Sequence, residues 1–196
     1  MDTYTCFSEL ERAERHGTDY RVRVVDRPSS PALILAPHGG LIEDGTSEVA
    51  AVVAGEQHSL FCFEGLKLRG GNRILHITSH RFDHPECLAL LRRSSVAMAI
   101  HGCLGRSQIY LGGLDTKLRQ YIAQRLKAAD LPVSLHGHKY PGTHPENICN
   151  RTRRRCGVQI ELTMDLRLPP WSKQIALELR AGLDHYLNLN HLELTA

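Results

Sequence analysis

Two histidines follow short apolar segments of the sequence, where buried strands would end. His38 comes just after Ala32–Ala36, and His101 comes directly after Val96–Ile100. A glycine follows each histidine, and glycine lets the backbone turn away so that the imidazole faces open space. Glu43 lies in the loop that follows His38, within reach of it. Two imidazoles and one carboxylate are the ligand set of a hydrolytic zinc site that keeps one position for water.

One histidine at the end of a strand is more often structural than metal-binding. Two of them on different buried strands, with an acid near one, favour a metal site. We therefore interpret His38, Glu43 and His101 as candidate zinc ligands. Cys103 follows His101 closely enough to join them. However, a thiolate is typical of closed structural zinc sites, so we predict that Cys103 is not a ligand.

Glu161 is a candidate catalytic residue because it interrupts the apolar run Val158–Leu162. A carboxylate in that setting is costly unless it has a partner or a function. Beside a zinc-bound water it would act as general base and then as general acid toward the leaving amine. The alternative is that Gln159 and Glu161 share the exposed face of an alternating strand.

Asn150 and Arg151 close a long loop, and the guanidinium fork of Arg151 would suit a substrate carboxylate. Further arginines follow at positions 153 to 155. This cluster is either a solvated turn or a cationic rim for a polyanionic chain. His76 and His80 are interpreted as core and strand-end residues.

Strands and helices alternate along the chain, which predicts an α/β fold. Apolar or alternating segments predict strands at 20–24, 32–36, 59–63, 74–78, 96–100, 133–135 and 157–162. Capping residues and periodicity predict helices at 46–55, 83–93, 116–129 and 172–187. In such a sheet, ligands bind beyond the carboxyl ends of the strands, so His38 and His101 are placed where a site would form.

The composition is that of a globular protein. The chain has 196 residues, of which 42% are hydrophobic and 23% charged, with a net charge of +3. This predicts one domain over residues 1–196, and the weak charge does not favour nucleic-acid binding. No apolar run reaches the roughly 20 residues of a membrane span. The first residues do not resemble a signal peptide, so we expect a cytoplasmic protein as synthesised. Six cysteines without a C-x-x-C motif are expected to be mostly reduced and buried, with a Cys149–Cys156 pair left open.

Four blocks of the sequence, in order, resemble those of a known family. They are Ala36–Glu48, His76–Ser79 with Phe82–Pro85, Ala99–Gly102, and Cys149–Arg151 with Gly157–Leu162. From about residue 20 to 190 the chain resembles the poly-γ-glutamate hydrolase family. These are zinc-dependent enzymes typified by phage proteins that cleave the γ-linked glutamate polymer of bacterial capsules. If the chain is phage-encoded, the resemblance implies release by cell lysis.

The resemblance implies a fold similar to that of the zinc carboxypeptidases, a mixed sheet sandwiched by helices. It implies zinc bound by His38, Glu43 and His101, Glu161 as the catalytic carboxylate, and Asn150 with Arg151 on an acidic group of the substrate. The chain departs from the carboxypeptidases in one respect. Their first two ligands follow an H-x-x-E spacing, and two more residues separate His38 from Glu43 here.

The predicted function is therefore a zinc-dependent amidohydrolase that cleaves γ-glutamyl amide bonds of poly-γ-glutamate. One alternative is a deacylase of small N-acyl acidic amino acids on the same zinc site. A second is a non-catalytic nucleic-acid-binding protein that uses the Arg153–Arg155 cluster, which the modest net charge disfavours.

Overall fold

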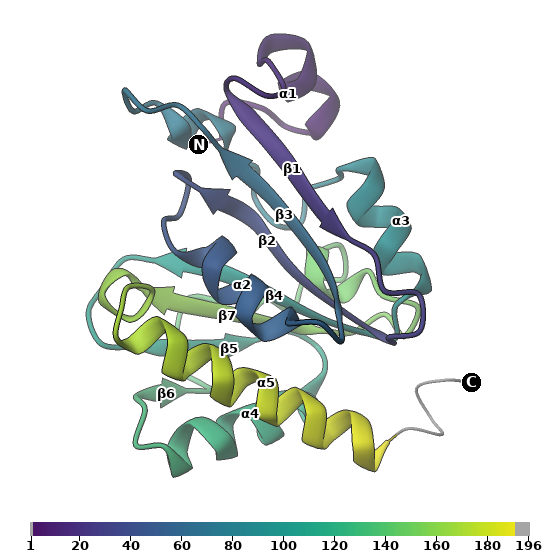
Figure 1. Ribbon diagram of the computed structural model, residues 1–196, viewed down its shortest axis with the longest axis vertical. Helices are drawn as coiled ribbons and strands as arrows, with labels where there is room; N and C mark the ends of the chain where they lie inside the picture. The colour runs from purple at the N-terminus through teal and green to yellow at the C-terminus, as the bar shows by residue number, and fades with distance from the viewer. Residues whose placement is uncertain (1, 191–196) are drawn as a thin grey trace.

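The computed structural model describes residues 2–190, in which seven strands form one mixed sheet with helices on both faces (Figure 1). The strands are β1 (Tyr20–Val25), β2 (Ala32–Gly40), β3 (Ser59–Gly65), β4 (Val96–Cys103), β5 (Ile109–Gly112), β6 (Val133–Ser134) and β7 (Val158–Thr163). The α-helices are α1 (Phe7–Ala13), α2 (Thr46–Ala54), α3 (Pro85–Arg93), α4 (Thr116–Ala128) and α5 (Trp171–Leu189). Short 3-10 helices are η1 (Asn72–Leu75), η2 (Ile148–Asn150) and η3 (Met164–Leu166). Of the domain predicted over 1–196, residue 1 and residues 191–196 lie outside the described residues.

The central strands run parallel, which brings their carboxyl ends to one edge of the sheet. The strand order is β1-β3-β2-β4-β7-β5-β6. Strands β3, β2, β4 and β7 pair in parallel, whereas β1 and β5 run antiparallel to their neighbours β3 and β7. From β2 the chain continues to β3 on one side and later to β4 on the other. Such a switch in direction leaves a crevice outside the carboxyl ends of the two strands, and β2 and β4 carry His38 and His101 there.

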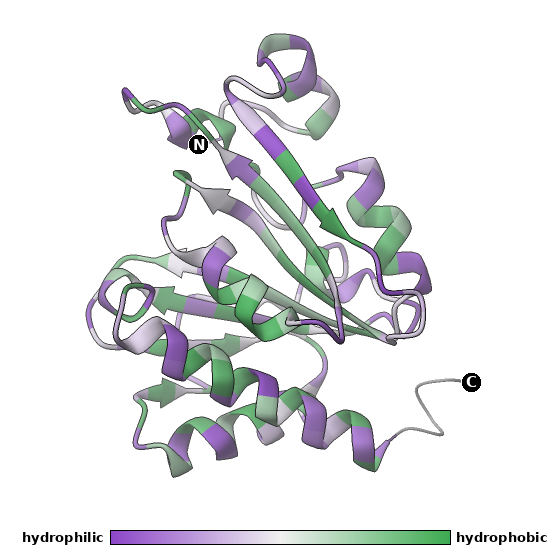
Figure 2. Ribbon diagram, viewed as in Figure 1, coloured by the Kyte–Doolittle hydropathy of each residue, from purple (hydrophilic) through white to green (hydrophobic). Residues whose placement is uncertain are grey.

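Apolar side chains pack on both faces of the sheet. Helices α2, α4 and α5 cover one face, with Ala50, Ile122 and Leu179 in its core. On the other face, Leu10 of α1 and Leu91 of α3 pack with residues of β2 and β3. Figure 2 shows hydrophobic central strands flanked by helices of mixed hydropathy. Because β2 and β3 are buried on both faces, their sequences read as continuous apolar runs rather than alternating ones.

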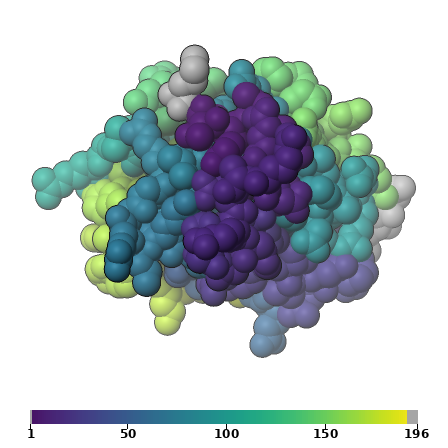
Figure 3. All heavy atoms as spheres, turned by 90° about the horizontal axis from the view of Figure 1, so that it is seen from above, coloured from purple at the N-terminus to yellow at the C-terminus, as the bar shows by residue number. Residues whose placement is uncertain are grey.

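The N-terminal segment packs against the outer strands and the segment around η1. The ring of Phe7 meets that of Tyr20 edge-on at 6.0 Å. The backbone N–H of Phe7 donates to the carboxylate of Asp83 at 2.6 Å. Seen from above, this purple segment lies beside the blue segment that contains η1 (Figure 3). The contact brings Asp2 next to His76.

The predicted fold class, a mixed α/β sheet between helical layers, is confirmed. Two local predictions are wrong. Residues 74–78 do not form a strand. The preceding strand, β3, already pairs with β1 on one side and β2 on the other, so it has no free edge for them, and the segment instead begins inside η1. Strand β2 does not end at Pro37 but continues to Gly40 past a register shift. Helix α1 and strand β5 were not predicted.

Candidate active site

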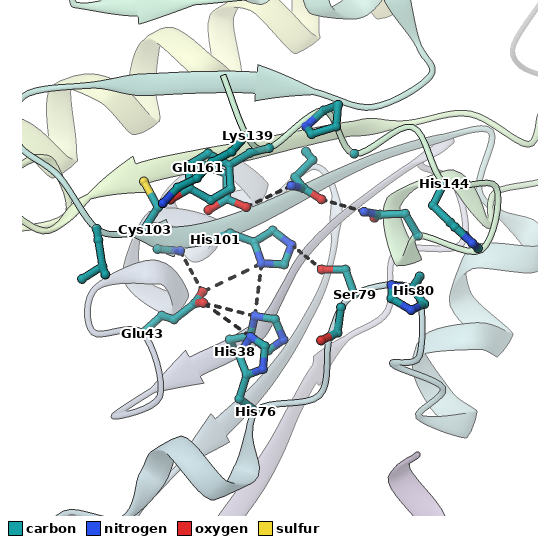
Figure 4. Close-up of a pocket in the computed structure, with 18 of the residues that line it drawn as sticks. His38, Glu43, His76, Ser79, His80, His101, Cys103, Lys139, His144 and Glu161 are labelled. Atoms are coloured by element: carbon teal, nitrogen blue, oxygen red, sulfur yellow. Dashed lines mark hydrogen bonds and ion pairs between the residues drawn. The ribbon is translucent and has the colours of Figure 1, made fainter. Parts of the chain in front are cut away.

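A pocket of about 710 Å³ opens at the carboxyl ends of the central strands. His38 of β2, His101 of β4 and Glu161 of β7 line it, together with Glu43 from the loop after β2 (Figure 4). These four residues were predicted to belong to one site, and the structure brings them together. The rest of the lining comes from residues 73–80, 102–104 and 139–147, and from residue 159.

Three potential ligand atoms face one another in this pocket. Nδ1 of His38 lies 3.4 Å from Oε1 of Glu43 and 3.1 Å from Nδ1 of His101. Nδ1 of His101 lies 3.8 Å from Oε2 of Glu43. Both imidazoles are buried, with 1% of His38 and 2% of His101 exposed. The three side chains thus present two nitrogens and a carboxylate to one shielded point.

The second nitrogen of each imidazole has a partner of its own. Nε2 of His38 donates to the carbonyl of Ile77 at 2.8 Å, and Nε2 of His101 lies 3.4 Å from the hydroxyl of Ser79. A neutral imidazole that donates through Nε2 keeps a lone pair on Nδ1. Two lone pairs 3.1 Å apart repel each other unless a proton or a cation lies between them. Metal-binding histidines typically donate their other N–H in this way, so the residues fit a metal ion.

The backbone holds the Glu43 carboxylate against the two histidines. The N–H of Glu43 donates to the carbonyl of His38 at 2.9 Å. The N–H of Gly102 donates to Oε2 of Glu43 at 2.7 Å. At Gly40 the φ angle is 59°, and a Cβ would lie 2.6 Å from the carbonyl oxygen of Gly65. Only glycine satisfies both conditions, which lets the chain turn beside β3 and return with Glu43.

The charges of the cluster are coupled. Burial alone would raise the pKa of Glu43, but His38, His101 and the Gly102 amide lower it to about 2. Burial disfavours charge on His38, but the Glu43 carboxylate, the Ile77 carbonyl and the charge of Glu161 together raise the pKa of His38. Burial and the charge on His38 lower the pKa of His101 to about 3. Glu43 is therefore ionised and His101 neutral, which are the forms that bind a metal ion.

His76 is a further member of the cluster that sequence reasoning missed. Its Nε2 lies 4.0 Å from Oε1 of Glu43, and its ring stacks on that of His38 with centroids 4.0 Å apart. One ligand atom each from His38, Glu43 and His76 all lie within 4.8 Å of one another. Nδ1 of His76 contacts the carboxylate of Asp2 at 2.8 Å, and Asp2 also accepts from the N–H of Thr78 at 2.7 Å. This carboxylate orients His76 as the Ile77 carbonyl orients His38.

Glu161 is buried, so the alternative of an exposed strand face is wrong. The residue is 7% exposed and lines the pocket. Burial, with the negative charge of Glu43, raises the pKa of Glu161 to about 8. Nε2 of Gln159 donates to Oε1 of Glu161 at 2.9 Å, and Nδ2 of Asn147 donates to Gln159 at 2.7 Å. This chain of hydrogen bonds fixes the carboxyl group while leaving it able to take and release a proton near neutral pH.

Cationic and hydroxyl groups line other parts of the pocket. The side chains of Arg73 and Lys139 are exposed and line it. Lys139 lies over the ring of Tyr140, with its Nζ 5.3 Å from the ring centroid. Burial raises the pKa of Tyr140 to about 12 and that of the Cys103 thiol to about 11. Both groups are thus protonated at neutral pH, and a protonated thiol is a poor metal ligand.

Asn150 and Arg151 do not line this pocket. Asn150 is fully buried, and its side-chain amide forms hydrogen bonds with the backbone. Its Oδ1 accepts from the N–H of Gly157 at 3.2 Å, and its Nδ2 donates to the carbonyl of Gly142 at 2.8 Å. Arg151 turns toward the neighbouring surface and pairs with Glu146 at 2.7 Å. The structure therefore does not bring Asn150 and Arg151 into the pocket that contains Glu43 and Glu161. Asn150 instead stabilises the long loop through these hydrogen bonds.

The six cysteines are free, which leaves Cys149 and Cys156 unpaired with each other. Within residues 2–190, no helix is long and apolar enough to cross a membrane.

The fold and the cluster together define an α/β domain with a histidine–carboxylate centre at the switch point of its sheet. The family described as poly-gamma-glutamate hydrolase matches residues 4–176. The chain belongs to this family.

Related proteins and structures agree with this assignment. UPF0714 protein YndL of Bacillus subtilis (strain 168) is 38% identical over 169 residues, which are 85% of this chain and 66% of YndL. A bacteriophage poly-gamma-glutamate hydrolase superposes with a TM-score of 0.91 at 29% identity, covering 96% of this chain and 100% of the other. A structure described as zinc-free apo YndL gives a TM-score of 0.84 at 33% identity, covering 96% of this chain and 98% of the other.

The fold is also shared with more distant proteins. A putative carboxypeptidase A from Shewanella denitrificans OS-217 has a TM-score of 0.52 at 13% identity, covering 82% of this chain and 58% of the other. This likeness confirms the predicted carboxypeptidase-like fold. The chain spans 66% of YndL and 60% of the prophage-derived relative YoqZ from the same strain.

Proposed function

We propose that the protein is a zinc-dependent amidohydrolase that cleaves γ-glutamyl amide bonds of poly-γ-glutamate. The observation that carries the proposal is the convergence of His38, Glu43 and His101 opposite the buried Glu161 in one pocket. The family match and the bacteriophage hydrolase support the substrate. The description of the YndL structure as zinc-free supports the metal.

His38, Glu43 and His101 would bind the zinc ion, and His76 lies close enough to adjust or replace one of them. When bound, zinc acidifies a coordinated water and polarises the substrate carbonyl. The protein contributes a shielded site in which Glu43 is ionised and His101 is neutral, and His38 would release its proton when the metal ion binds. The Ile77 carbonyl, the Ser79 hydroxyl and the Asp2 carboxylate hold the three imidazoles in place.

Glu161 is assigned as the residue that moves the proton. It would take a proton from the attacking water and deliver it to the nitrogen of the leaving amine. A carboxyl group raised to a pKa of about 8 by burial and by Glu43 is suited to both steps. A cation near Glu161 would lower this value toward neutrality, where acceptance and release of a proton are balanced.

The substrate is assigned by charge. A γ-linked glutamate chain keeps one free carboxylate on every residue. Arg73 and Lys139 place two cations on the lining of the pocket, where they could bind such carboxylates. We assign them the carboxylate-binding role that the sequence analysis gave to Asn150 and Arg151.

The test is the turnover of poly-γ-glutamate by the Glu161→Gln variant, with zinc content measured in the same sample. Glutamine keeps the shape of the side chain and its hydrogen bond to Gln159 but cannot accept the proton. We expect retained zinc and a loss of activity on the order of 10²–10⁴-fold. The exposed Glu56 provides a control, because Glu56→Gln should leave activity unchanged. Near-normal polymer shortening by zinc-loaded Glu161→Gln would overturn the assignment of the proton transfer to Glu161.

The dependence of the cleavage rate on chain length distinguishes poly-γ-glutamate from the alternative substrate class, small N-acyl acidic amino acids. If the polymer is the substrate, cleavage measured by size-exclusion chromatography should be faster for long chains than for N-acylglutamate. Cleavage of N-acylglutamate with intact polymer would support the deacylase and overturn the proposal.

A further inference from the structure

A second cavity, of about 460 Å³, lies next to the long loop and is not used by the proposed chemistry. Four arginines line it, Arg92 of α3 with Arg151, Arg153 and Arg155 of the loop before β7. Glu146 is the carboxylate in the lining, and Leu88 supplies an apolar side chain. We call this cavity the arginine groove.

Two of the four arginines of the groove have no side-chain partner among the described residues. Glu146 pairs with Arg151 at 2.7 Å, and Arg153 donates to the hydroxyl of Ser95 at 2.8 Å. Arg92 and Arg155 are exposed, and neither has a side-chain hydrogen bond or ion pair with another described residue. Two of the four guanidinium groups, those of Arg92 and Arg155, are therefore available to bind an anion. The groove carries a concentrated positive charge in a chain whose net charge is only +3.

The arginine groove and the candidate active site are lined by the same segment. His144 and Asn147 line the active-site pocket, whereas Glu146 and Arg151 line the groove. The side chain of Asn150 and the 3-10 helix η2 fix this segment to the body of the protein. A chain long enough to cross the segment could therefore occupy both cavities.

We propose that the arginine groove is a second carboxylate-binding site, which binds a segment of the polyanionic substrate away from the bond that is cleaved. This inference rests on the proposed function for the identity of the polymer. The Arg151–Glu146 pair already demonstrates in the structure that the groove accommodates a carboxylate on a guanidinium group. A γ-linked glutamate chain would supply carboxylates at regular intervals to Arg92 and Arg155.

The lining of the groove favours carboxylates over a nucleic acid. Sites for single-stranded nucleic acid combine cations with aromatic side chains that stack on bases. The lining of the arginine groove contains no aromatic residue among the described side chains. A polycarboxylate needs only cations at a suitable spacing, and that is what the groove provides.

The test is a binding measurement with the double variant Arg92→Ala, Arg155→Ala. These two side chains make no contact that the fold needs, so the variant should remain folded. A matched control is Lys127→Ala, Lys173→Ala, which removes the same charge from exposed positions on α4 and α5. Binding of fluorescently labelled long poly-γ-glutamate is measured in EDTA, where no cleavage occurs. A γ-linked glutamyl dipeptide and a single-stranded DNA are used as competitors.

Loss of two exposed ion pairs predicts a Kd for the long polymer that is roughly 2- to 30-fold higher in the arginine variant than in the lysine control. With zinc restored, kcat on the dipeptide should be equal in both variants. Equal polymer affinity of the two variants would overturn the proposal, and so would groove-dependent binding that DNA competes for more strongly than the polymer does. Failure of the wild-type protein to cleave any polymer while the groove-dependent binding persists would overturn the proposed function and leave the groove as a polycarboxylate site.

Discussion

In the metal-free protein, Glu161→Gln should increase stability at neutral and alkaline pH but not at acidic pH. The pKa of Glu161 is about 8 in the folded protein, against an ordinary value of 4.5. Between these values the folded chain retains a proton that the unfolded chain has lost. The free energy of unfolding of the wild-type protein therefore falls as pH rises from about 4.5 to about 8. Glutamine does not titrate, so the variant escapes this loss.

The size of the effect follows from the two pKa values. A shift of about 3.5 units corresponds to at most about 5 kcal/mol, at 1.36 kcal/mol per unit. Coupling to Glu43 and relaxation of the pocket reduce this to on the order of 2–4 kcal/mol. For a chain of this length, that is a difference in Tm of roughly 5–15 °C above pH 8. Below about pH 4.5 the two proteins should have nearly the same Tm.

The assay is thermal or urea unfolding in EDTA from about pH 4.5 to pH 9. Because other titrating groups are common to both proteins, the difference between the two curves isolates Glu161. The Glu56→Gln variant should run parallel to the wild-type protein at every pH, since Glu56 is exposed. A constant difference between Glu161→Gln and the wild-type protein across this range would refute the assignment of Glu161 as a buried, protonated carboxyl group.

Three further outcomes are expected. Asn150→Ala should lower the free energy of unfolding by about 2–4 kcal/mol in urea titrations, because backbone partners lose their hydrogen bonds; a raised KM with unchanged stability would restore a substrate-binding role to Asn150. Asp2→Ala should weaken zinc binding about 10-fold in competition with a chelator, because His76 loses the carboxylate that orients it; an unchanged affinity would remove His76 from the metal site. Cys103→Ser should keep zinc and most of the activity, since the thiol is protonated at neutral pH; loss of metal would show that Cys103 is a ligand.

The convergence of His38, His101 and Glu161 could be predicted because it depends on one property of the fold. Apolar runs identified the central strands, and parallel strands bring their carboxyl ends together. The loop from His38 to Glu43 is short and begins with glycines, so the carboxylate could return only to the same end of the sheet. These features are local in the sequence and require no knowledge of distant contacts.

His76 and Asp2 could not be predicted in the same way. His76 follows a 3-10 helix, in a segment whose apolar residues resemble those of a strand. Its position depends on packing against β2 and on the carboxylate of Asp2. Arg151 and Asn150 are adjacent in sequence, yet one is exposed to the arginine groove and the other is buried in the loop. The orientation of two neighbouring loop residues depends on tertiary contacts that no short pattern records.

Zinc-dependent hydrolysis is tested by reconstituting the metal-free protein with zinc and following cleavage of poly-γ-glutamate. We expect that about one zinc ion binds per chain, that polymer shortening rises in proportion to bound zinc, and that His38→Ala or His101→Ala abolishes both. A fully zinc-loaded, folded protein that leaves the polymer intact, or polymer cleavage that persists at the same rate in EDTA, would contradict it.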